Sequence, residues 1–117
     1  MALFLSASVI PTSAETIDED LATICGWYKS LATEEKYKNF SSENKFSFVF
    51  DPKTKSSINN IQMKKFYSAL RTTQASQRYE LMKAYAEGTL GKNWECPPMQ
   101  QIMDEFNSLD PYFQYSK

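Results

Sequence analysis

Histidine is absent from this chain of 117 residues. Without an imidazole there is no Ser-His-Asp or Cys-His catalytic arrangement, no histidine-based zinc site and no haem site with a proximal histidine. Glycine occurs only three times, and the separated Gly26, Gly88 and Gly91 form no glycine-rich phosphate loop. We therefore expect no enzyme, no catalytic residues, no cofactor and no metal.

A large excess of charge of either sign is also missing. The 13 lysines and arginines stand against 14 aspartates and glutamates, which gives a formal net charge of -1. Because nucleic-acid affinity comes mostly from neutralising phosphates, we do not expect a nucleic-acid partner. The length and the 42% of hydrophobic residues are typical of one small folded domain.

The first 14 residues carry no charge and have the character of a secretory signal peptide. An apolar stretch over residues 2–10 precedes a proline and three small residues at positions 12–14, as at a signal-peptidase site. The basic n-region of such a signal is missing, and the stretch is too short to span a bilayer. We predict a signal peptide over residues 1–14 and a periplasmic or secreted protein. An ordinary buried N-terminal helix is the alternative.

Two cysteines, Cys25 and Cys96, allow one intramolecular disulfide. An exported protein meets an oxidising compartment, in which paired thiols become disulfides. A redox enzyme would need a Cys-x-x-Cys motif, and two thiolates alone are too few ligands for a metal. We therefore predict a structural disulfide, which would stabilise the fold by roughly 4 kcal/mol in the chain-entropy model.

The period of the apolar residues predicts an all-α domain over residues 15–110 with four main helices. We expect these helices at about 17–38, 58–72, 74–87 and 98–109. The prediction is thus a four-helix, disulfide-linked small domain.

Helix ends and inner faces follow from the same pattern. Thr16, Ser57 and Thr73 are the expected N-caps of the first three helices, and Gly88 is the expected left-handed residue that ends the third. The expected inward residues are Ile17, Leu21, Ile24, Cys25, Tyr28 and Leu31, then Ile58, Ile61, Phe66, Tyr67 and Leu70, then Tyr79, Met82, Tyr85 and Ala86, and finally Ile102, Met103, Phe106 and Leu109.

One short segment alternates between apolar and polar residues. Lys45 to Phe50 places Phe46, Phe48 and Phe50 at every second position, which is typical of an extended strand. The sequence offers no second strand. We expect an extended aromatic segment that fills the core, or one that pairs with another molecule.

Charge is distributed unevenly along the chain. Residues 15–40 have a balance of -3, residues 51–83 a balance of +5 and residues 84–117 a balance of -3. The basic middle helices either present a face to an acidic partner or lie against the acidic helices, where their charges are neutralised. Lys64, Lys65 and Arg71 are the candidate contacts of a basic face.

The chain closes with an aromatic segment over residues 111–117. It either folds back on the helices or forms a docking surface. The complete set of candidate partner contacts is Phe46, Phe48, Phe50, Lys64, Lys65, Arg71, Tyr112, Phe113 and Tyr115.

A signal-like start, a cysteine in the first helix and a second one in Trp94-Glu95-Cys96-Pro97 resemble small exported helical proteins of bacteria. The acid-stress chaperones of the HdeA kind are similar in size and in their single disulfide. The periplasmic immunity proteins that neutralise type VI secretion amidases are similar in size, helical content and cysteine use. The resemblance covers the architecture of residues 16–109 and no motif, and the cysteine spacing is longer than in the chaperones. It implies a bacterial periplasmic protein and assigns no functional residue.

Together these features predict a small exported, non-enzymatic domain that binds another protein through surface complementarity. An acid-stress chaperone and a toxin-immunity protein are the alternatives, and a hydrolase is the least favoured one. A homodimer stays open, and we expect no transmembrane span.

Overall fold

The computed structural model describes the backbone of residues 13–109 and the side chains of residues 16–109. The predicted signal peptide therefore lies almost entirely outside the described residues. The aromatic residues Tyr112, Phe113 and Tyr115 lie outside them as well. The described residues begin and end within helices, at Ser13 and Leu109.

The described part is helical and contains no β-strand, which confirms the all-α prediction. The elements in chain order are α1 (Ser13–Thr33), α2 (Glu35–Lys38), α3 (Ser42–Phe50), α4 (Pro52–Lys55), α5 (Ile61–Leu70), the 3-10 helix η2 (Ala75–Gln77), α6 (Arg78–Leu90) and α7 (Pro97–Leu109). The predicted number of four main helices was too low, because α3 adds a helix of 9 residues between the first and second predicted helices.

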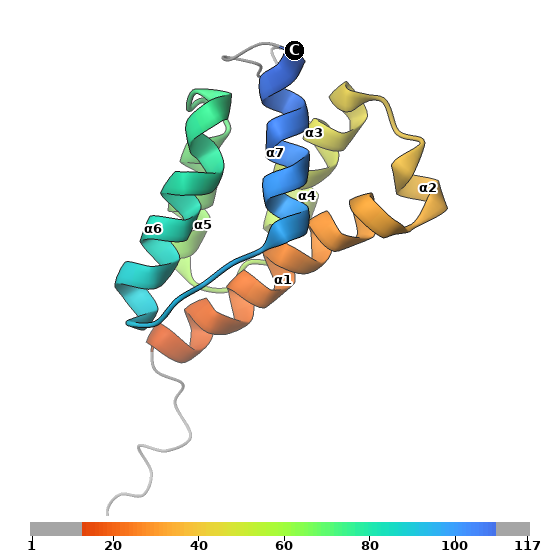
Figure 1. Ribbon diagram of the computed structural model, residues 1–117. Helices are drawn as coiled ribbons and strands as arrows, with labels where there is room; N and C mark the ends of the chain where they lie inside the picture. The colour runs from red at the N-terminus through yellow and green to blue at the C-terminus, as the bar shows by residue number, and fades with distance from the viewer. Residues whose placement is uncertain (1–12, 110–117) are drawn as a thin grey trace, which may run out of the picture.

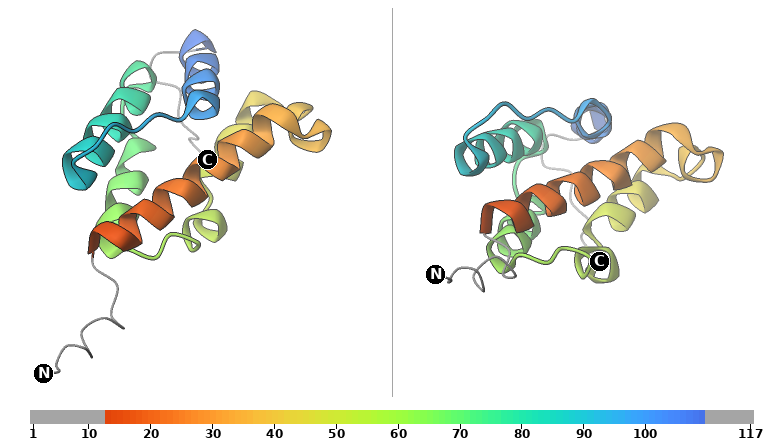
Figure 2. Two further views of the ribbon diagram at one scale, coloured as in Figure 1. Left: turned by 60° about the horizontal axis from the view of Figure 1, so that its bottom comes forward. Right: turned by 90° about the horizontal axis from the view of Figure 1, so that it is seen from below.

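The long helix α1 runs diagonally across the lower ends of α6 and α7 in Figure 1, and it contacts both of them. Helices α5 and α6 lie next to each other, and α3 packs on α1 and α7 (Figure 2). The core between these helices consists mainly of Leu21, Ile24, Tyr28, Leu31, Phe46, Val49, Phe50, Met63, Tyr67, Leu70, Met82, Ala86, Met99, Ile102, Met103 and Phe106. Within the described residues, no helix combines the length and the apolar character that crossing a membrane requires.

The apolar stripe predicted for the first helix is confirmed, but the helix is divided in two. Glu34 adopts an extended conformation (φ -90, ψ 132) and separates α1 from α2. The break lets Tyr37 pack against Phe40 and Phe48, with ring centroids 5.3 and 4.9 Å apart. Thr16 lies inside α1 and is not its N-cap.

The prediction of an extended aromatic segment was wrong, because the residues from Lys45 to Phe50 belong to the helix α3. The Ser41 side chain caps the helix by accepting a hydrogen bond from the Asn44 backbone N–H at 3.1 Å. In a helix, Phe46 and Phe50 share one buried face with Val49, while Phe48 points to another side. Because this segment is a helix, it cannot pair with another molecule as a β-strand.

The start of α5 also differs from the prediction. Asn60, not Ser57, is the N-cap, and its side chain accepts from the Met63 backbone N–H at 3.0 Å. The buried carboxylate of Asp20 accepts hydrogen bonds from the backbone N–H groups of Asn59 (2.9 Å) and Asn60 (2.8 Å). Asp20 thus fixes the chain just before α5, and with the helix starting there Ile61 is 58% exposed instead of buried.

The ends of the last two helices need smaller corrections. Helix α6 starts at Arg78, after η2, and it continues through Gly88 to Leu90. Gly91, with φ 73, is the left-handed residue that ends it. Helix α7 buries its predicted face except for Leu109, which is 54% exposed in the last position of the helix.

The disulfide prediction is confirmed. Cys25 and Cys96 are bonded, with Cα atoms 5.9 Å apart and a sequence separation of 71. The bond joins the middle of α1 to the residue before α7. It therefore links the first helix of the described residues to the start of the last one.

Candidate functional site

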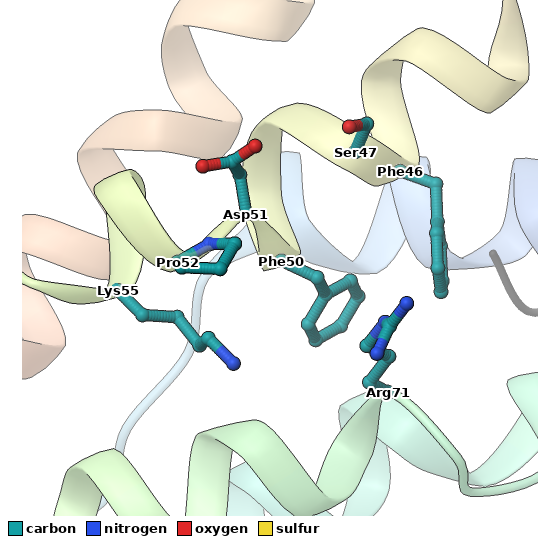
Figure 3. A pocket seen from close by; sticks show the side chains of 7 residues that line it. All are labelled: Phe46, Ser47, Phe50, Asp51, Pro52, Lys55 and Arg71. Carbon is teal, nitrogen blue, oxygen red and sulfur yellow. The ribbon is translucent and has the colours of Figure 1, made fainter. Parts of the chain in front are cut away.

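A pocket of about 230 Å³ opens between the end of α3, the start of α4 and the end of α5 (Figure 3). Its lining consists of Phe46, Ser47, Phe50, Asp51, Pro52, Lys55 and Arg71. We call this space the α3–α5 pocket. It combines an aromatic floor with two cations and one carboxylate.

Local sequence signals produce the shape of the pocket. Asp51 has an extended backbone (φ -68, ψ 142) that ends α3, and its carboxylate accepts from the Lys53 backbone N–H at 2.8 Å. Pro52 then opens α4, since a proline suits the first turn of a helix. The turn directs α4 away from the axis of α3 and brings Lys55 to the rim of the pocket.

The two cations reach the pocket from different elements. Lys55 ends α4, and Arg71 is the C-cap residue of α5. Figure 3 shows both side chains directed toward the space beside the Phe50 ring. Together with the Asp51 carboxylate, the charged groups of the lining are two cations and one anion, an excess of one positive charge.

A third cation lies against the aromatic rings that line the pocket. Arg78 is fully buried, and its Nε and Nη2 donate to the carbonyl oxygens of Leu70 (2.7 Å) and Arg71 (3.1 Å). Its guanidinium carbon lies 5.1 Å from the ring centroid of Phe46 and 5.8 Å from that of Phe50. Desolvation lowers the pKa of Arg78 from its usual value. The same two rings therefore line the pocket and contact a buried cation.

Two buried tyrosines complete this polar centre of the core. The hydroxyl oxygens of Tyr28 and Tyr67 lie 2.7 Å apart in a hydrogen bond, and the Tyr67 ring stacks on Phe50 at 5.0 Å. Burial raises the pKa of Tyr28 well above its usual value. Burial, and after it the charge and hydrogen bond of Tyr28, raise the pKa of Tyr67. Both phenols therefore stay protonated in the folded protein at pH values where an exposed tyrosine ionises.

Because of the raised pKa values of Tyr28 and Tyr67, we expect the free energy of unfolding to fall at alkaline pH. Exposed tyrosines titrate at about pH 10, so above that pH the unfolded chain loses protons that the folded chain retains. The stabilisation is fully present below pH 10 and falls as the pH rises beyond it, by about 1.4 kcal/mol per tyrosine at pH 11. Urea unfolding at pH 8 and pH 11 measures the loss.

The matched control for this prediction is the double variant Tyr28→Phe, Tyr67→Phe, which removes both hydroxyls together. Between the two pH values, the free energy of unfolding of the wild type should fall by roughly 3 kcal/mol more than that of the variant. Equal losses in the two proteins would show that the buried tyrosines do not cause the effect.

The predicted contact residues have different positions in the structure. Phe46 and Phe50 are 0% and 3% exposed, so they form the floor of the pocket and offer no protruding edge to a partner. Phe48 is half-buried against Tyr37. Tyr112, Phe113 and Tyr115 lie outside the described residues.

The basic candidates divide into a flank and an outer face of α5. Lys64 and Arg71 are seven residues apart, which is two helical turns, and both are half-buried on the flank that carries Arg71 into the pocket. Lys65 is exposed on the outer face, near the exposed Ile61. The structure thus brings two of the three predicted cations to one side of α5.

Internal neutralisation, one of the two interpretations of the basic middle segment, applies to part of it, and a binding face stays a prediction. Lys83 pairs with Glu87 at 2.7 Å, so this charge is neutralised within α6, and Arg78 is buried. Lys55 lines the pocket but was not among the candidate contacts. Its position in the segment of charge +5 was the one sequence signal that indicated it.

No metal centre is evident in the described part of the chain, where no three acidic, cysteine or histidine side chains form a group that could hold an ion. Comparison with protein-family models, with curated proteins and with solved structures finds no match for this chain. The function must therefore be inferred from the geometry of the α3–α5 pocket and of the neighbouring helices.

Proposed function

We propose that the chain is a small exported domain of the bacterial periplasm that binds another protein, and that the α3–α5 pocket with the basic flank of α5 is its binding surface. The observation that carries the proposal is the convergence of Lys55 and Arg71, from two helices, on one aromatic pocket. The partner segment that fits this surface is acidic.

The chemistry of the pocket suits a carboxylate. Arg71 and Lys55 both bring a positive charge to the lining of the pocket, and together they attract a negatively charged side chain. The apolar part of the same or the next partner side chain would pack on Pro52, which is exposed in the lining of the pocket. The buried guanidinium of Arg78, which lies close to the rings of Phe46 and Phe50, adds to the positive potential.

The size of the pocket favours a side chain over a small molecule. Its volume is about 230 Å³, whereas sites for small molecules and cofactors are usually about 300–1,000 Å³. Binding also fits better than catalysis, because the charged groups that line the pocket are two cations and one carboxylate that already caps α4.

The flank of α5 sets the spacing of the partner's acidic residues. Lys64 and Arg71 are two helical turns apart, a rise of about 10 Å along the axis. An extended partner strand covers this distance in about three residues. We therefore expect a segment with two acidic residues at that spacing, one of them in the pocket.

Charge reversal tests the proposal. The double variant Lys55→Glu, Arg71→Glu should lose the capture of periplasmic partners that the wild-type chain retains, with an affinity at least about ten-fold lower. Binding should also weaken as salt is added. Pull-down from the envelope fraction, followed by titration of the captured protein, gives both readouts.

Lys92→Glu is the matched control, because Lys92 is an exposed lysine on the connection between α6 and α7. It changes one charge outside the pocket and should leave capture unchanged. Undiminished binding by the double variant, or an equal loss in Lys92→Glu, would exclude the α3–α5 pocket as the binding surface.

A further inference from the structure

A second hollow lies beside the disulfide. It is an open groove of about 510 Å³ between the middle of α1 and the first turn of α7, lined by Cys25, Lys29, Ala32, Thr33, Pro97, Pro98 and Gln101. None of these residues lines the α3–α5 pocket. We call this space the disulfide groove.

The two sulfur-bearing residues are not equally accessible. Cys25 is half-buried and lines the disulfide groove, whereas Cys96 is 0% exposed. The Cys96 backbone N–H also donates to the hydroxyl of the buried Tyr79 at 2.9 Å, which fixes its place behind the groove. Thiol–disulfide exchange requires an attacking thiolate to reach one of the sulfurs, so access selects which one is attacked. In the folded protein Cys25 is the more accessible of the two residues.

Charge at the groove favours an anionic attacking group. Lys29 follows Cys25 by one helical turn, is exposed and lines the same groove. Its ammonium group attracts an approaching thiolate and stabilises negative charge near the Cys25 sulfur. The volume of the groove leaves room for residues that flank an attacking cysteine, in addition to its thiol.

The departing sulfur belongs to Cys96, the residue before α7. The dipole at the start of a helix favours a thiolate there, while burial opposes it. Because the Cys96 sulfur stays enclosed, it remains positioned to attack the Cys25 sulfur again.

We propose that Cys25 is the residue through which a dithiol oxidoreductase exchanges with this protein. The enzyme's thiolate attacks the Cys25 sulfur, a bond forms between these two sulfurs, and the Cys25–Cys96 bond breaks with its electron pair on Cys96, which takes up a proton. The enzyme's second thiolate then attacks the enzyme's first sulfur in the mixed disulfide, and Cys25 leaves with the electron pair of the broken bond and takes up a proton. The disulfide is reduced by two electrons and the enzyme dithiol is oxidised to a disulfide. The reverse steps form the Cys25–Cys96 bond through the same intermediate.

Glutathione is the probe for the first test, used on the full oxidised chain. After incubation with reduced glutathione and acid quenching, peptide mapping should place the glutathione on Cys25 in about ten-fold excess over Cys96 or more. A mixed disulfide mainly on Cys96, or an equal division between both cysteines, would overturn the proposal.

The dependence of the exchange rate on urea separates reaction of the folded protein from reaction after unfolding. At urea concentrations well below the unfolding midpoint, the rate should change little, because the Cys25 sulfur is reached without unfolding. A rate that rises with the full urea dependence of global unfolding would overturn the proposal. Lys29→Glu should slow exchange with the anionic glutathione, and Lys36→Glu, an exposed lysine of α2, is the matched control.

Single-cysteine variants give an independent readout. The Cys25 thiol in Cys96→Ser should react with oxidised glutathione about ten-fold faster than the Cys96 thiol in Cys25→Ser, or more. If both variants are too unstable to fold, the mapping on the wild-type chain decides the question. Faster reaction of Cys96 in folded variants would contradict the assignment.

Discussion

Replacement of both cysteines by serine should lower the free energy of unfolding by about 4 kcal/mol. The disulfide joins residues separated by 71 positions, and in the chain-entropy model a cross-link over so long a loop removes much of the freedom of the unfolded chain. A small domain is typically stable by about 5–15 kcal/mol, so this single bond accounts for a large share of the margin. Urea unfolding of the oxidised wild type and of Cys25→Ser, Cys96→Ser measures the difference.

Two controls separate the effect of losing the disulfide from the effect of introducing a serine hydroxyl. Cys96 is fully buried, so a serine hydroxyl at that position adds the cost of burying a polar group. The variant Cys25→Ser, Cys96→Ala avoids this cost, and the reduced wild type keeps both sulfurs without the bond. All three proteins should lose about the same stability, within roughly 1–2 kcal/mol. A loss below about 1 kcal/mol in the reduced wild type would show that the bond does not stabilise the fold in this way.

Strong periodicity made the longest helices predictable. The stripe from Ile17 to Leu31 recurs at helical spacing over several turns, and no strand pattern accounts for it. The same holds for α7, whose inner face is Met99, Ile102, Met103 and Phe106. The disulfide was predictable for another reason, because two cysteines permit only one intramolecular pairing.

The aromatic segment shows where a short pattern is ambiguous. Phe46 and Phe50 are four residues apart, so they fall on one side of a strand and on one face of a helix. Val49 is the residue that distinguishes the two, since it is buried beside them only in a helix. The cap from Ser41 and the contacts of Phe46 with Phe106 of α7 favour the helix. One of these signals is a tertiary contact, which local periodicity does not contain.

Long-range contacts also decided where α5 begins. Asp20 lies about forty positions before the backbone groups that it holds, at Asn59 and Asn60. Sequence spacing alone cannot place a carboxylate of α1 beside that turn. Ser57 and Asn60 are both good caps by residue type, so the choice between them needed the fold.

Part of the candidate site was indicated by charge alone. The excess of bases in residues 51–83 includes Lys55 and Arg71, which line the pocket, and Arg71 was among the named candidates. The pattern could not show that Arg78, seven positions later, points into the core, because an arginine in a sequence normally indicates an exposed side chain. Burial of this cation depends on the carbonyls at the end of α5 and on two rings of α3.

Arg78→Ala should therefore destabilise the protein by about 3–5 kcal/mol. The substitution removes a fully buried side chain and leaves the carbonyl oxygens of Leu70 and Arg71 without its donors. Arg78→Met restores most of the volume and avoids the cavity, so it should lose less than Arg78→Ala. The difference between these two variants measures the packing contribution, and the remaining loss in Arg78→Met reflects the lost hydrogen bonds and the contacts with the rings.

Arg71→Ala is the matched comparison, because Arg71 is half-buried at the pocket and its backbone carbonyl remains available to Arg78. Its stability should fall by about 1 kcal/mol or less, while binding of an acidic partner weakens. Arg78→Met should show the opposite result, with lower stability and a smaller effect on binding, because Arg78 is fully buried and does not line the pocket. Urea unfolding and partner titration on both variants would separate these roles, and equal losses of stability would contradict the division between a structural cation and a binding cation.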